Sequence, residues 1–118
     1  MKLDYDCVRN ALLTVESLPP GCTLDDRCLH AYPLLNGYSR EQIDYTVQRI
    51  AEAGFVPVNS VIKTLSGVIY SISDLTWDGH QHLDYIRNDS VWSEIRKRIS
   101  HGNIPFEAII GIAKDLLG

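Results

Sequence analysis

The chain has 118 residues, which suits one domain with a single core and is too short for two independent domains of ordinary size. Apolar residues make up 45% and charged residues 22%, a globular composition that excludes a disordered chain. The net charge of −4 argues against a dedicated nucleic-acid binder, since phosphate contacts need clustered Lys and Arg, although a local basic patch would outweigh the total.

The first predicted element is a helix near the N-terminus. Apolar residues recur at helical spacing over residues 3–18, and Asp4 or Asp6 stands where a cap is needed. Pro19-Pro20-Gly21 then ends the helix. Residues 23–35 have an irregular pattern, for which we predict one short strand running towards Asn36-Gly37.

The second predicted helix has the clearest start and end. Ser39-Arg40-Glu41-Gln42 fits a capping box, and Gly54 stands where a left-handed cap is needed. Residues 55–62 and 68–73 are rich in β-branched and aromatic residues, and residues 63–67 between them predict a hairpin. Pro57 indicates an edge strand.

Three more helices are predicted after the hairpin. They run from Trp77 to Arg87 after Thr76, from Ser90 to Ser100 after a cap at Asp89 or Ser90, and from Pro105 to Leu117. Trp77 and Trp92 are interpreted as large anchors at helix starts. The broad apolar face of the last helix either packs back on the first helix or joins two copies in a homodimer.

This order of elements predicts an α+β winged helix: helix, short strand, recognition-type helix, β-hairpin wing, then a C-terminal helical extension. Residues 48–56 resemble the end of a winged-helix recognition helix, and residues 75–83 resemble the LTxxGxxxL string that follows many wings. We therefore expect one domain over residues 1–118, with a winged-helix core at 1–75 and a helical extension at 76–118.

The whole chain also resembles one narrower family. The matching strings include Met1-Lys2-Leu3-Asp4, Gly37-Tyr38-Ser39, Thr76-Trp77-Asp78-Gly79-His80 and Ile104-Pro105-Phe106-Glu107. They are similar to the bacterial and phage proteins of the domain of unknown function 2513 family. The chain departs from that family at Thr46, where a His is common. The resemblance implies the fold and a phage or prophage setting, and no mechanism.

Six side chains point away from the apolar stripe of the second helix: Glu41, Gln42, Tyr45, Gln48, Arg49 and Glu52. In a DNA-reading mode Gln42 and Gln48 would contact adenine, Arg49 guanine or phosphate, and Tyr45 a phosphate. The two glutamates on that face would repel the DNA backbone. A solvated or protein-binding face is therefore an equal alternative.

Further basic residues complete the candidate contact set. Arg40 lies at the start of the same helix, and Lys63 is the one cation that the hairpin offers. Arg96, Lys97 and Arg98 form a basic cluster in the C-terminal extension. These three either complement the negative end of a helix dipole or contact a phosphate or an acidic partner.

The sequence contains no motif that indicates catalysis, a cofactor or a metal, so we do not expect an enzyme. Cys7 is expected in the core, and Cys22 and Cys28 form no CxxC pair. His80 and His82 point about 200° apart on a helix and cannot share one ion. The turn-forming Asp25-Asp26 is assigned no chemistry.

Two functions follow as hypotheses. The first is a phage- or prophage-associated transcriptional regulator whose helix at residues 39–53 enters the major groove of DNA. The second is a non-enzymatic module that binds a host or phage protein. The chain has no apolar run long enough for a membrane span and no signal peptide at its start, which predicts a cytoplasmic protein without a membrane partner.

Overall fold

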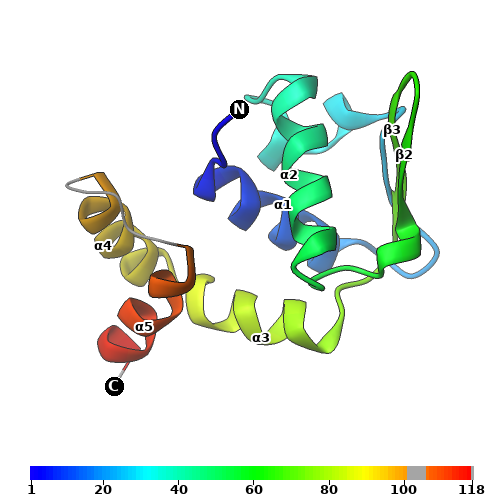
Figure 1. Ribbon diagram of the computed structural model, residues 1–118. Helices are drawn as coiled ribbons and strands as arrows, with labels where there is room; N and C mark the ends of the chain where they lie inside the picture. The colour runs from blue at the N-terminus through cyan, green and yellow to red at the C-terminus, as the bar shows by residue number, and fades with distance from the viewer. Residues whose placement is uncertain (101–105, 118) are drawn as a thin grey trace. The chain divides into compact units, whose positions relative to one another are not determined.

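The computed structural model describes residues 1–100 and 106–117 (Figure 1). These residues form an α+β protein with a small three-stranded antiparallel sheet, which confirms the predicted class. They group into two compact units, residues 1–80 and 81–118. No helix within the described ranges is long and apolar enough to cross a membrane. The elements are α1 (Tyr5–Ser17), β1 (Leu24–Asp25), η1 (Leu29–Ala31), η2 (Pro33–Leu35), α2 (Arg40–Glu52), η3 (Val58–Ser60), β2 (Val61–Thr64), β3 (Gly67–Ile72), α3 (Trp77–Ile86), α4 (Asp89–Ser100) and α5 (Phe106–Leu117).

Helix α1 forms as predicted, with a side-chain cap at its start. Oδ1 of Asp4 accepts a hydrogen bond from the N–H of Cys7 at 3.0 Å, so Asp4 and not Asp6 is the cap. The helix ends at Ser17, two residues before Pro19, which has no N–H to continue the ladder. Cys7 is fully buried, as expected. The buried residues of α1 are Cys7, Val8, Ala11, Leu12, Thr14 and Val15.

The segment between α1 and α2 contains less strand than the sequence predicts. Only Leu24 and Asp25 form β1, and η1 and η2 follow. The carboxylate of Asp25 accepts a hydrogen bond from the N–H of Arg27 at 2.8 Å, which turns the chain. Pro33 then opens η2, where its missing N–H costs nothing. The predicted short strand is therefore confirmed at Leu24–Asp25, and the prediction that it runs towards Asn36 is wrong.

Helix α2 has the predicted caps at both ends. Oγ of Ser39 accepts a hydrogen bond from the N–H of Gln42 at 3.1 Å. At the other end Gly54 adopts φ +79°, which a residue without Cβ accepts easily, and the N–H of Phe55 donates to Ile50 O at 2.9 Å. The buried residues of α2 are Ile43, Thr46, Val47, Ile50 and Ala51.

The turn of the hairpin is shorter than the predicted segment 63–67. Thr64 pairs with Gly67, so only Leu65 and Ser66 form the turn. The residues after Phe55 that were predicted as strand include η3, because Pro57 precedes a 3₁₀ turn in which its carbonyl accepts the N–H of Ser60 at 3.0 Å. Pro57 therefore lies before the edge strand and not within it. The strand order β1-β3-β2 leaves β2 at the edge of the sheet.

The end of α2 is joined to the start of α3 by a compact set of hydrogen bonds. The N–H of Thr76 donates to Phe55 O at 2.9 Å, and its Oγ donates to Gly54 O. The same Oγ accepts the N–H of Gly79 at 3.1 Å, so Thr76 caps α3 as predicted. A Cβ on Gly79 would lie 2.1 Å from Phe55 O. The two strings that indicated the element order therefore meet at one junction.

Only one of the two tryptophans is the anchor that the sequence predicts. Trp92 is buried, whereas Trp77 is 78% exposed, so the prediction for Trp77 is wrong. The packed side of α3 contains Gly79 and Leu83. Because Trp77 lies two residues before Gly79, its side chain points to the opposite side of the helix.

Residues 81–118 contain α4 packed against α5. Helix α4 begins at Asp89, and its cap is Asn88, whose Oδ1 accepts the N–H of Val91 at 3.0 Å. The predicted caps, Asp89 and Ser90, therefore lie inside the helix. The predicted start of the last helix at Pro105 lies outside the described residues. In α5 Ile109 and Ala113 are buried, while Leu116 and Leu117 are exposed.

Candidate functional site

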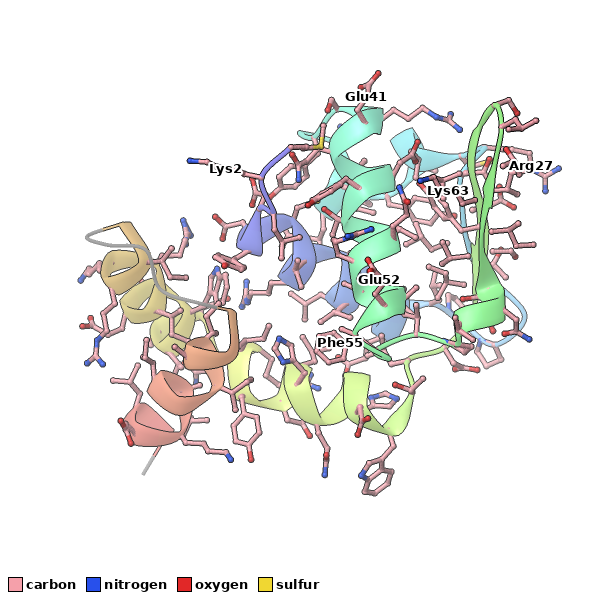
Figure 2. All side chains as sticks on the ribbon, in the orientation of Figure 1. Lys2, Arg27, Glu41, Glu52, Phe55 and Lys63 are labelled. Carbon is pink, nitrogen blue, oxygen red and sulfur yellow. The ribbon has the colours of Figure 1, made fainter. Side chains whose placement is uncertain are left out.

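A groove between α2 and β2 brings three of the predicted contact residues together. Its volume is about 180 Å³. In Figure 2, Lys63 lies between α2 and the hairpin, and Glu52 lies near the end of α2. Apolar residues form much of the lining, with charged residues of both signs among them. The lining residues are Gln48, Arg49, Ala51, Glu52, Val58, Val61 and Lys63.

The charges in this groove are mostly compensated within the chain. The guanidinium of Arg49 lies 2.6 Å from the carboxylate of Glu52 and 5.1 Å from the ring centre of Tyr45. Lys63, in contrast, has no carboxylate within 4.0 Å among the residues that the structure describes. Lys63 is therefore the cation of the groove that remains available to a ligand.

The hairpin beside the groove exposes large apolar side chains. Ile62 lies directly opposite Ile69 in the register, and both point away from the face that buries Val68 and Tyr70. Ile62 is 56% exposed and Ile69 is 51% exposed, and Leu65 in the turn is fully exposed. We call Ile62, Leu65 and Ile69 the hairpin patch. Paired apolar side chains on a solvent face are typical of an interaction surface.

Arg40 takes part in a polar cluster that ties α2 to the sheet. Its guanidinium lies 3.6 Å from Asp26 and 3.7 Å from Asp44. Tyr70 completes the cluster, because its O–H donates to Asp44 at 3.0 Å and its N–H donates to Asp26 at 3.1 Å. The sequence predicted only a turn-forming role for Asp26. In the structure its buried carboxylate accepts a hydrogen bond from the backbone of the sheet. Burial raises the pKa of Asp44, and burial and the Asp44 charge raise that of Tyr70.

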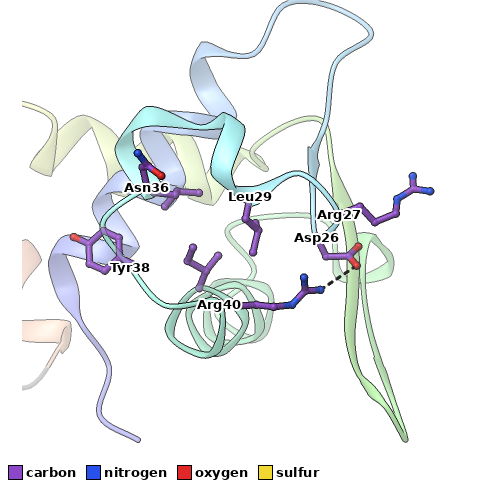
Figure 3. A pocket seen from close by; sticks show the side chains of 8 residues that line it. Asp26, Arg27, Leu29, Asn36, Tyr38 and Arg40 are labelled. Atoms are coloured by element: carbon purple, nitrogen blue, oxygen red, sulfur yellow. Dashed lines mark ion pairs between the residues drawn. The ribbon is translucent and has the colours of Figure 1, made fainter.

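A pocket of about 240 Å³ lies beside this cluster (Figure 3). Arg40 reaches across it to Asp26, while Arg27 extends away into solvent. Arg40 was predicted to contact DNA or a partner, and the structure places its charge between two carboxylates of its own chain. A contact with an outside phosphate would have to compete with both.

Replacing Arg40 with glutamine is expected to destabilise the protein by about 1 kcal/mol, because Asp26 and Asp44 lose their shared cation while remaining largely buried. Urea unfolding followed by circular dichroism measures this change. Arg27→Gln is the matched control, since its pair with Asp25 is exposed and should contribute almost nothing. Equal effects of the two substitutions would contradict a structural role for Arg40.

The remaining predicted residues lie elsewhere. The amide of Gln42 lies 3.5 Å from Oγ of Thr46 on its own helix. Arg96, Lys97 and Arg98 lie on α4, in the unit formed by residues 81–118. Lys97 and Arg98 stand in the last turn, each 3.8 Å from Glu94, which agrees with the dipole-complementing alternative.

Comparison with known proteins identifies the family. A family model described as "Hypothetical protein (DUF2513)" matches residues 2–104, which is most of the chain. The chain belongs to the DUF2513 family. The resemblance seen in the sequence is thereby confirmed. An uncharacterised protein of Haemophilus influenzae Rd is 28% identical over 127 residues, covering 99% of this chain and 96% of that protein. No solved structure matches.

The departure of this DUF2513 chain at Thr46 concerns the core and not the exposed face. Thr46 is fully buried, and its Oγ donates to Gln42 O at 2.8 Å. The residues that sequence reasoning missed are those of the hairpin patch. Their signal was present, because Ile69 is apolar at a solvent-facing position of the alternation Val68-Tyr70-Ile72.

In the part of this DUF2513 chain that the structure describes, reactive side chains do not form a cluster. Burial raises the pKa of the Cys7 thiol to about 11, which keeps it protonated and unreactive. Nδ1 of His80 lies 4.0 Å from Glu16, and His82 is buried. Within residues 1–100 and 106–117, no group of three or more His, Cys, Asp or Glu residues could hold a metal ion.

Proposed function

We propose that this chain is a winged-helix protein whose function is to bind another protein through the hairpin patch and the adjoining groove. The order α1, β1, α2, β2, β3 and the strand order β1-β3-β2 support the winged-helix assignment. In that assignment α2 is the recognition-type helix and the β2–β3 hairpin is the wing. The fold assignment rests on the order of the elements, and the choice of a protein as the ligand rests on the surface of the wing.

The hairpin patch is the observation that favours a protein partner. Ile62, Leu65 and Ile69 are exposed on the element that would lie against a phosphate backbone in a DNA complex. Apolar side chains gain no free energy from phosphates, whereas burial against a protein releases water from them. The partner surface that fits the hairpin patch is therefore apolar.

The distribution of charge supports the same choice. Residues 1–80 contain ten acidic and six basic residues, so the unit that carries the wing also carries the negative charge of the chain. Glu41 and Glu52 lie on α2 itself, and Arg40 and Arg49 are held by carboxylates of the chain. DNA binding depends on cations that neutralise phosphates, and few remain here.

DNA binding is the second candidate, favoured by one observation. Gln48, Arg49 and Lys63, which were predicted from the sequence as base or phosphate contacts, line one groove beside the wing. For α2 to use them, Arg49 would have to leave Glu52. A regulator of this kind would bind duplex DNA with strong salt dependence.

Fluorescence anisotropy with a labelled duplex and capture from bacterial lysate separate the two functions. We expect no DNA binding tighter than about 100 µM at physiological salt. We also expect the double variant Ile62→Glu, Ile69→Glu to lose proteins that the wild type captures. Leu34→Glu, which changes an exposed leucine outside the hairpin, should capture them normally. Salt-dependent DNA binding that Gln48→Ala and Arg49→Ala abolish would establish the DNA-binding function instead.

A further inference from the structure

We propose that the protein bound by the hairpin is a second copy of this chain, joined along the open edge of β2. This inference rests on the proposed function and names its partner. In the proposed dimer, the β2 strands of the two copies form an antiparallel pair around a two-fold axis at Ile62. The support comes from the unpaired backbone groups of β2, from the register that they allow, and from the charges beside them.

The direction of the backbone groups of β2 follows from its neighbour. The N–H of Tyr70 donates to Asp26, and its carbonyl accepts the N–H of Asp26 at 3.4 Å, so both groups face β1. Tyr70 and Val61 are therefore a non-hydrogen-bonded pair, and the carbonyl of Val61 points to the open edge. By alternation the N–H and the carbonyl of Lys63 point there as well.

These open groups select one register for a second copy. When Val61 pairs with Lys63 of the second copy, each Lys63 N–H donates to the Val61 carbonyl across the axis. The register with Lys63 opposite Lys63 would place like charges side by side and is disfavoured. In the favoured register the two Ile62 side chains lie directly opposite each other. Together with both Ile69 side chains, they form one continuous apolar row on the outer face.

The charges fit the same register. Lys63 points to the face that buries Val68, its partner in the hairpin, and this face is directed towards α2. In the dimer, Lys63 of one copy lies beside Val61 of the other, at the groove that contains Glu52. The Glu52 side chain is 62% exposed and can accept a second cation besides Arg49. Each copy thus supplies the uncompensated cation that the groove of the other copy accepts.

The same axis brings the hairpin tip of one copy to the base of the other. Counting along the pair, Leu65 lies across from residue 59 of the second copy, next to Val58. Val58 is 75% exposed and lines the groove. One symmetry operation therefore brings Val58, Ile62 and Leu65 to the seam between the two copies, and Ile69 lies one strand away from it. Because the paired strands have only four residues, we expect a weak dimer, with a Kd on the order of 100 µM.

Cysteine cross-linking tests this geometry in the full chain, in a background in which Cys22→Ser and Cys28→Ser remove the exposed thiols. Ile62→Cys should form a disulfide-linked dimer on mild oxidation, because the two Cα atoms of a non-hydrogen-bonded pair lie about 4.5 Å apart. Ile69→Cys is the matched control, with nearly equal exposure. Its two copies would lie three strand spacings apart, about 14 Å, too far for a disulfide.

Sedimentation equilibrium of the wild type up to about 1 mM, ten times the expected Kd, gives a second readout. We expect self-association that Ile62→Glu weakens at least tenfold and Leu34→Glu leaves unchanged. Equal cross-linking of both cysteine variants, a strictly monomeric wild type, or association lost through Leu117→Glu instead would overturn the proposal. If cross-linking fails while the hairpin variant still loses captured proteins, only this inference fails and the proposed function stands.

Discussion

Replacing Gly79 with alanine is expected to destabilise the protein by about 3 kcal/mol, although alanine is the better helix former. The added Cβ would lie 2.1 Å from Phe55 O and 3.2 Å from Cβ of Leu75. The first of these contacts is with backbone that cannot rotate away. The Phe55 carbonyl also accepts the N–H of Thr76, so moving it disrupts the junction between α2 and α3.

Urea unfolding followed by circular dichroism measures this loss. Gly111→Ala is the matched control, because Gly111 is also helical but, among the described residues, no atom beyond its chain neighbours and its own helix backbone lies within 4 Å of the added Cβ. That control should be neutral or stabilise the protein by up to about 1 kcal/mol. A Gly79→Ala variant as stable as the wild type would show that the junction is not tightly packed.

Acidification from pH 6.5 to pH 4 is expected to cost the protein about 3 kcal/mol of stability through His82 alone. Burial lowers the pKa of His82 from 6.5 to about 4, because the buried site disfavours the charged imidazolium. Below pH 6.5 the unfolded chain therefore binds a proton that the folded chain does not. The stabilisation is complete above pH 6.5 and is lost as the pH falls to about 4.

The free energy of unfolding of the wild type and of His82→Leu, measured across this pH range, checks the prediction. The wild-type value should fall relative to the variant by about 3 kcal/mol, since leucine does not titrate. Because the pKa of Asp44 is raised, its protonation increases the stability of the folded protein as the pH falls. This contribution is present in both proteins and cancels in the comparison. Parallel curves for the two proteins would rule out His82 as the source.

Residues within one turn of each other made the helix ends predictable. Asp4, Ser39 and Thr76 each accept an N–H three residues along the chain, and Gly54 ends α2 in the left-handed conformation. Such bonds need no distant partner, so the residue types and their spacing are sufficient. The cap of α4 was missed because Asn88, Asp89 and Ser90 are all good caps, and the local pattern does not choose among them.

The candidate contact residues show which features a local sequence pattern does not predict. Helical spacing correctly placed Arg49 on the exposed side of α2, yet Arg40 on the same helix is held by Asp26, 14 positions earlier. The pairing of Ile62 with Ile69, which creates the hairpin patch, depends on the register of the turn. A shift of one residue in the pairing of β2 with β3 would have turned Ile62 to the other face and separated it from Ile69.

The sequence by itself determined the family, the α+β class, the order of the main elements and most helix boundaries. Short-range hydrogen bonds and apolar spacing specify these features within a few residues. Only the tertiary structure decided which polar and apolar side chains stay in water. Asp26 and Tyr70 are 44 positions apart, and Phe55 and Gly79 meet only when the chain folds. Exposure of Trp77 follows from such a distant contact, because Gly79 is on the side of α3 that packs against Phe55, and no local pattern contains that contact.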